Sequence, residues 1–166
     1  MGFKRDFKLG KNGETAVKQL FKKFGIDLEE NVNKAKLKEY DLIGKLGTKK
    51  ITIECKYDYM SEETGNLAIE YENCANETDS GINATKAKLW IHLISDKGFP
   101  TIWATSVKKL KEFIKNTKPW KTVTRAGDGN ASLYLYNDFT ILDAVFTRVD
   151  NVDKDTFVKI IKELLK

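Results

Sequence analysis

Apolar residues recur at helical spacing in three segments of the chain. Within residues 11–24 they lie three or four positions apart, which predicts an amphipathic helix with Asn12 as its N-cap and Gly25 at its end. Residues 106–115 and 155–165 show the same spacing. Each segment has one apolar face, so we expect three helices that each bury one side.

Alternation of apolar and polar residues predicts β-strands between these helices. Residues 40–46 and 49–57 lie on either side of Gly47-Thr48, which predicts a β-hairpin. Further strands are expected at residues 67–71, 89–94, 101–104 and 133–136. Loops or turns are expected at residues 73–83, 96–100 and 125–130, and a short helix at residues 84–88.

This order of elements indicates a sheet that is flanked by helices. A helix, then a run of strands, then mixed elements favour an α/β or α+β arrangement. A chain of 166 residues is one domain by the usual size range, and no repeat or long linker divides it. We therefore expect residues 1–166 to form a single domain.

Composition narrows the class of protein. Apolar residues make up 41% and charged residues 32% of the chain, which is typical of a soluble globular protein. No apolar run approaches the roughly 18–20 residues of a membrane helix, and the N-terminus lacks a signal-peptide core. Cys55 and Cys74 are too few for a disulfide framework and lack zinc-ligand spacing. We expect reduced thiols, a cytoplasmic location and no membrane partner.

Basic residues are concentrated in two stretches of a chain whose net charge is +5. Residues 4–23 carry seven Lys or Arg against two acids, and residues 108–125 carry seven against one. Such clusters suit a polyanion such as DNA, with Lys18, Lys22 and Lys23 as candidate phosphate contacts. A solubilising lysine surface explains the same charges equally well.

The predicted strand at residues 49–57 carries charges on one face. Because side chains alternate along a strand, Glu54 and Lys56 share a face with Thr52, whereas Cys55 lies on the apolar face. One interpretation is a solvated edge with a local ion pair, which contributes little stability. The other is a metal-dependent site that cuts phosphodiesters.

A second acid favours the metal site. Asp41 lies thirteen residues before Glu54, and a turn at Gly47-Thr48 would bring both to the same end of a ladder whose strands are about 4.8 Å apart. Two carboxylates that close repel unless a cation lies between them. Mg²⁺ prefers oxygen ligands and needs only one or two protein carboxylates. Lys56, on the same face, would then hold a water or stabilise charge on the scissile phosphate.

A third acid, Glu14, lies in the first predicted helix beside its buried stripe, where a charge costs free energy unless it has a partner. Glu14 in a helix, then Asp41, then Glu54-Cys55-Lys56 across a hairpin, resembles the PD-(D/E)XK nuclease superfamily, which includes restriction endonucleases and Holliday-junction resolvases. The stretches SGINATKAKLWIH and RAGDGN are similar to small phage-encoded members. Tyr40 stands where the family often has proline.

The resemblance covers about residues 10–105 and leaves about 106–166 as a C-terminal elaboration. It implies an α/β, restriction-endonuclease-like core with a central mixed β-sheet flanked by helices. It also implies a Mg²⁺-dependent deoxyribonuclease, with Mn²⁺ as a substitute, in a prokaryotic or phage-infected cell. Endonucleases of the restriction, homing or junction-resolving kind share this core, and cutting two strands requires two sites, so a homodimer or higher homo-oligomer is expected.

The resemblance assigns a role to each matching residue. Asp41, Glu54 and the backbone carbonyl of Cys55 would bind the metal, with Glu14 as a further ligand, and Lys56 would position the attacking water. The implied catalytic set is Glu14, Asp41, Glu54 and Lys56. Thr85 and Lys86 belong to a segment that often faces nucleic acid in this family, although an ordinary surface lysine explains Lys86 equally well.

Some residues remain open to two interpretations. Glu70 either adds to the metal site or is only solvated, and His92 fits a hydrogen-bonded strand residue better than a catalytic one. Trp120 is expected as a core or cap aromatic, with base stacking as the alternative. For the whole chain, a non-catalytic nucleic-acid-binding module on the same fold is the alternative to a nuclease.

Overall fold

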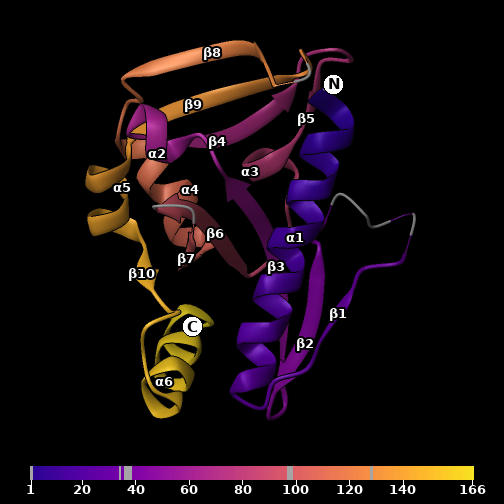
Figure 1. Ribbon diagram of the computed structural model, residues 1–166, viewed down its shortest axis with the longest axis vertical. Coiled ribbons are helices and arrows are strands. Elements are labelled where there is room, and N and C mark those ends of the chain that lie inside the picture. The colour runs from indigo at the N-terminus through magenta and orange to yellow at the C-terminus, as the bar shows by residue number, and fades with distance from the viewer. Residues whose placement is uncertain (1, 34, 36–38, 97–98, 128) are drawn as a thin grey trace.

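The computed structural model describes residues 2–33, 35, 39–96, 99–127 and 129–166, and it contains two β-sheets with helices around them (Figure 1). The chain is an α/β protein whose central sheet is mixed and flanked by helices. None of the helices in the described ranges is long and apolar enough to span a lipid bilayer.

The central sheet has six strands in the order β1-β2-β3-β6-β7-β10. Strands β3 and β6 run parallel, and the other neighbours run antiparallel. Its strands are β1 (Leu28–Glu30), β2 (Leu42–Leu46), β3 (Lys49–Asp58), β6 (Leu89–Asp96), β7 (Phe99–Ser106) and β10 (Thr147–Arg148).

A second, antiparallel sheet has four strands in the order β5-β4-β9-β8 and crosses the top of the view in Figure 1. Its strands are β4 (Asn66–Asn73), β5 (Thr78–Asp79), β8 (Lys121–Ala126) and β9 (Ala131–Asn137). The helices are α1 (Gly2–Lys23), α2 (Ser61–Thr64), α3 (Gly81–Ala84), α4 (Val107–Asn116), α5 (Asp138–Val145) and α6 (Lys154–Leu164).

Helix α1 packs its apolar stripe on one face of the central sheet. Val17 and Phe21 are fully buried in a core with Ile53, and the rings of Phe21 and Phe157 of α6 meet edge to face at 5.0 Å. The predicted helix is therefore confirmed, and Gly25, with φ of 82°, follows its end. The prediction of Asn12 as N-cap is wrong, because the helix already begins at Gly2.

A second core covers the opposite face of the central sheet. Trp90 of β6 is buried there with Leu67 and Ile69 of β4. Strand β3 is thus covered on both faces, and Glu54 on its polar face is only 6% exposed. The interpretation of this face as a solvated edge is therefore wrong.

The predicted hairpin is confirmed, with Gly47 in the left-handed region at φ of 61°. Strand β2 begins two residues later than predicted, at Leu42, which pairs with Ile53. The segment expected as a helix at residues 84–88 is extended after Ala84, because the Lys86 N–H donates to the carbonyl of Glu39 instead of to a helical partner.

Other expectations are corrected by the second sheet. Residues 67–71 form a strand as predicted, but it belongs to the second sheet and not to the central one. Strand β8 and helix α5 were not expected from the sequence.

Trp120 is 62% exposed and donates its indole N–H to Asn66 at 2.8 Å, so it is not a core residue. The predicted turn at residues 96–100 falls partly on 97–98, which lie outside the described residues.

Two glycines in the left-handed region provide a matched stability test. Gly47 has open space where a Cβ would be, whereas a Cβ on Gly81 would approach the carbonyl oxygen of Glu70 to 2.2 Å. Gly47→Ala should lower the free energy of unfolding by about 1–2 kcal/mol, the cost of an alanine in this region. Gly81→Ala should lower it by roughly 2–5 kcal/mol, because the backbone must also move. Urea unfolding of both variants checks this difference, and equal losses would contradict the close packing of α3 on β4.

Candidate active site

Asp41 lies where the pairing of β2 with β3 ends. Its N–H donates to the carbonyl of Ile53 at 2.9 Å, which continues the ladder by one bond beyond Leu42. Its carboxylate oxygen Oδ2 then accepts the N–H of Cys55 at 2.8 Å. The side chain thus replaces the backbone carbonyl of a strand that has ended, and this bond fixes the carboxylate beside β3.

Glu54 and Lys56 lie next to this point on the polar face of β3. The Lys56 ammonium binds Oε1 of the buried Glu54 at 2.7 Å and keeps 31% of its side chain exposed. The structure therefore brings Asp41, Glu54 and Lys56 together, as the hairpin register predicts.

Burial and mutual charge set the protonation of these groups. Burial raises the pKa of Glu54, and the charge of Asp41 raises it further, although Lys56 opposes both. Burial likewise raises the pKa of Asp41, against the attraction of Lys56 and the bond from Cys55. Burial lowers the pKa of Lys56, but the surrounding carboxylates of Glu54, Asp41 and Glu70 outweigh it and raise that pKa overall. Lys56 is consequently held as a cation.

Glu14 approaches the same site from helix α1. Its side chain is 16% exposed, its carboxylate binds Lys11 at 2.9 Å, and its charge contributes to raising the pKa of Asp41. Lys11 also binds Glu30 at 3.2 Å, and Glu30 in turn lies 3.7 Å from Lys18. The expected position of Glu14 beside the sheet is thus observed, and a chain of ion pairs connects it to β1.

The oxygen atoms at this point fit a small divalent cation. Within the described residues no three His, Cys, Asp or Glu side chains are grouped as a metal centre. Mg²⁺ nevertheless needs only one or two protein carboxylates and keeps several waters. In an antiparallel ladder the N–H and C=O of one residue point to the same side. The Cys55 carbonyl therefore faces the side of Asp41, so this carbonyl and the carboxylates of Asp41 and Glu54 are the candidate oxygen ligands.

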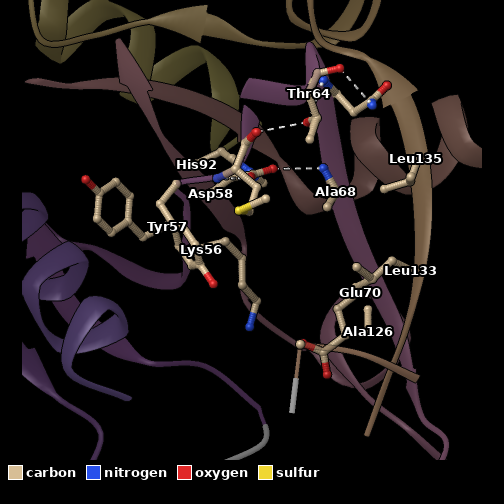
Figure 2. Close-up of a pocket in the computed structure, with 14 residues that line it drawn as sticks. Lys56, Tyr57, Asp58, Thr64, Ala68, Glu70, His92, Ala126, Leu133 and Leu135 are labelled. Carbon is tan, nitrogen blue, oxygen red and sulfur yellow. Dashed lines mark hydrogen bonds and ion pairs between the residues drawn. The ribbon is translucent and has the colours of Figure 1, made fainter. Parts of the chain in front are cut away.

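Glu70 of β4 faces Lys56 from the second sheet. It accepts a hydrogen bond from the hydroxyl of Ser80, and its charge contributes to the raised pKa of Lys56. Both residues line a cavity of about 450 Å³ between the end of β3 and the second sheet. Figure 2 shows the Lys56 side chain extending into this space and the ring of Tyr57 pointing the opposite way.

The residues expected to contact nucleic acid differ in accessibility. Lys22 and Lys23 are exposed on the last turn of α1, and Lys22 is about 12 Å further along the helix than Glu14. Lys86 is also exposed but is paired with Glu39 at 2.7 Å. Thr85 is buried, donates its hydroxyl to the carbonyl of Glu39, and accepts the N–H of Ala87. Thr85 thus lies inside the protein, behind the site.

His92 forms part of a buried polar group beside the site. Its Nδ1 accepts the indole N–H of Trp90 at 3.1 Å, and its Nε2 lies 3.7 Å from Asp58. The Asp58 carboxylate accepts the N–H groups of Ser61 and Ala68, so it joins β3 to α2 and β4. Sequence reasoning missed Asp58, although an Asp shortly before the polar stretch Ser61–Thr64 is a recognisable turn signal.

Comparisons with known proteins do not extend this description: no protein-family model matches the chain, and neither does any curated protein.

The raised pKa of Asp41 predicts a gain in stability when its charge is removed. A carboxyl group whose pKa is higher in the folded than in the unfolded protein stabilises the fold fully at a pH below its unfolded pKa. This stabilisation is lost as the pH rises through its folded pKa. Asp41→Asn keeps an acceptor for Cys55 but is neutral at every pH. With chelator present, the variant should therefore melt at a higher temperature than the wild type at pH 7, and the difference should shrink towards acid pH.

Glu30 provides a control in which removal of the charge should change the melting temperature in the opposite direction. A hydrogen bond from Lys11 lowers the pKa of Glu30, so its charge stabilises the fold above the ordinary pKa. Glu30→Gln should melt at a lower temperature than the wild type at pH 7, and this loss should vanish in acid. Melting curves for both variants from pH 3 to 8 test the pair. A lower melting temperature of Asp41→Asn at pH 7 would contradict the description of Asp41 as a buried carboxylate whose charge destabilises the fold.

Proposed function

We propose that this protein is a metal-dependent deoxyribonuclease that hydrolyses phosphodiester bonds in DNA. One observation carries the proposal: Asp41 lies within electrostatic reach of two further carboxylates, Glu54, which is paired with Lys56, and Glu14, which is paired with a Lys11 that Glu30 shares. Negative charge remains in excess at a largely buried point, and a divalent cation is the partner that compensates it.

Asp41 and Glu54 would hold the cation, together with the backbone carbonyl of Cys55. Bound there, Mg²⁺ would act as a Lewis acid on the scissile phosphate and lower the pKa of a bound water. The chain itself keeps the two carboxylates in place, through the Cys55 N–H at Asp41 and the Lys56 ammonium at Glu54. Preorganisation of this kind makes electrostatic stabilisation effective, because no groups have to rearrange during the reaction.

Lys56 would act as a hydrogen-bond donor and as a fixed positive charge. Its raised pKa keeps it protonated near neutral pH, so it is unsuited to remove a proton from water. Its exposed portion faces the cavity between the two sheets, where a phosphate oxygen would accept a hydrogen bond from the ammonium. In this role Lys56 orients the attacking water and stabilises charge on the phosphate.

The surface charge agrees with DNA as the substrate. The chain has a net charge of +5, and the exposed Lys22 and Lys23 lie on the helix that carries Glu14. Positive charge away from a negatively charged centre attracts the DNA backbone without occupying the metal ligands. Cleavage of both strands of a duplex or junction would require a homodimer or higher homo-oligomer, which supplies a second site.

Removal of the Glu54 charge should abolish cleavage and leave binding intact. Glu54→Gln preserves the shape of the side chain but loses the charge that holds the cation. We expect cleavage of plasmid and junction DNA in Mg²⁺ to fall about 100-fold or more. DNA affinity, measured by fluorescence anisotropy, should persist or increase because a negative charge near the phosphate is gone.

Glu112→Gln is the matched control, because Glu112 is an exposed carboxylate on helix α4. This variant should cut DNA at the wild-type rate. Unchanged turnover in Glu54→Gln would refute the assignment of the site. DNA binding by the wild type without any metal-dependent cleavage would instead assign the chain to the class of non-catalytic nucleic-acid-binding modules.

A further inference from the structure

The cavity beside Lys56 has two chemically different sides. Lys56 and Glu70 lie at one end of it, and the second sheet supplies an apolar wall. Figure 2 shows Glu70 and Ala68 on β4 together with Leu133 and Leu135 on β9 along that wall. The volume of about 450 Å³ lies within the range of sites that hold small molecules.

The apolar wall is not part of either core. In the register of the second sheet, Ala68 pairs with Leu135 and Glu70 with Leu133, so these side chains share one face. Leu67 and Ile69 occupy the other face, which packs on the second core. Leu133 and Leu135 are only partly buried, and they line the cavity. A flat apolar ligand would cover them.

Glu70 provides an acceptor at the edge of this wall. The Ser80 hydroxyl occupies its Oε1, and the close packing of Gly81 against the Glu70 backbone fixes its position. No hydrogen bond to its other carboxylate oxygen is found among the described residues. Asn66, a second polar group in the cavity, already accepts from Trp120 and donates to Thr64. Glu70 therefore offers an acceptor for a ligand N–H.

We propose that this cavity binds one unpaired nucleobase that carries an amino group, next to the phosphate held at Lys56. The inference rests on the proposed nuclease function and names the substrate class of the same site. A base has the required flat apolar surface, and a glutamate accepts from an amino group as it does from N4 of cytosine. The Lys56 ammonium provides the matching charge for the adjoining phosphate.

The size of the cavity sets the form of the DNA. A space of about 450 Å³ is of the size that holds one small molecule, so it admits a single base but not a base pair within a stacked duplex. The base beside the scissile phosphate must therefore be unpaired or leave the stack, and unpairing costs least in single-stranded DNA. The preferred substrate is accordingly a single strand, a flap or an unpaired junction arm.

Binding to short labelled oligonucleotides tests the pocket without relying on cleavage. The Glu54→Gln protein should bind oligo(dC) about tenfold more tightly than oligo(dT) in fluorescence anisotropy, because thymine lacks the amino group. Ala68→Phe added to this protein should lower the affinity for oligo(dC) about tenfold by filling the pocket. Ala75→Phe, at an exposed loop position, is the control and should leave the affinity unchanged.

Two further variants test the apolar wall and the Glu70 acceptor separately. Leu133→Gln preserves the size of the side chain and should also weaken oligo(dC) binding, which covers the case in which Ala68→Phe does not fold. Glu70→Gln should reduce the preference for dC over dT, because an amide both donates and accepts. Equal affinity for the two oligonucleotides, or unchanged binding in both wall variants, would overturn the proposal.

Cleavage by the wild type separates this inference from the proposed function. Single-stranded DNA should be cut at least about tenfold faster than the duplex of the same sequence, because no base pair has to open. Equal rates on both would overturn the pocket assignment and leave the nuclease standing. If no DNA is cut in Mg²⁺ or Mn²⁺ while the wall variants still lose oligo(dC) affinity, the nuclease proposal fails and the pocket assignment stands.

Discussion

The hydrogen bond from the Cys55 N–H to the Asp41 carboxylate is the contact on which the site depends. Strand β2 begins only at Leu42, which pairs with Ile53. The residues of β3 that follow Ile53 therefore have no antiparallel partner strand. The Asp41 side chain takes the place of that partner at 2.8 Å. A charged group is thereby fixed at the end of a β-ladder, beside Glu54 and Lys56.

The packing on both faces of β3 makes this charge costly. Helix α1 covers one face of β3, and the second sheet with its core covers the other, so water is largely excluded from Glu54. Burial raises the pKa of both Asp41 and Glu54, and Lys56 compensates only part of their charge. Buried charges that destabilise the folded protein in this way are typical of sites whose geometry serves binding or chemistry.

The central site was predictable because its signals are local. A glycine turn sets the register of a hairpin, and this register places Asp41 opposite Glu54 whatever the rest of the chain does. Alternation along β3 likewise separates Cys55 from Lys56. The apolar spacing in α1 sufficed to place Glu14 beside the sheet, although not to locate the start of the helix.

The second sheet could not be predicted, because long-range pairing creates it. Nothing in residues 67–71 tells whether they join the central sheet or pair with β9, more than sixty residues later. The burial of Glu54, the cavity and the approach of Glu70 to Lys56 all follow from that pairing. The expected helix at residues 84–88 failed for a related reason, since Lys86 and Lys88 bond to distant backbone carbonyls.

Direct titration with Mn²⁺ tests the central claim that these carboxylates form a cation site. Isothermal calorimetry on the wild type should show one ion bound per chain, with proton release that increases towards acid pH, because the carboxyl groups with raised pKa must ionise to bind it. Asp41→Asn should abolish this binding while the protein remains folded. Equal binding by the variant and the wild type, or none by either, would contradict the account.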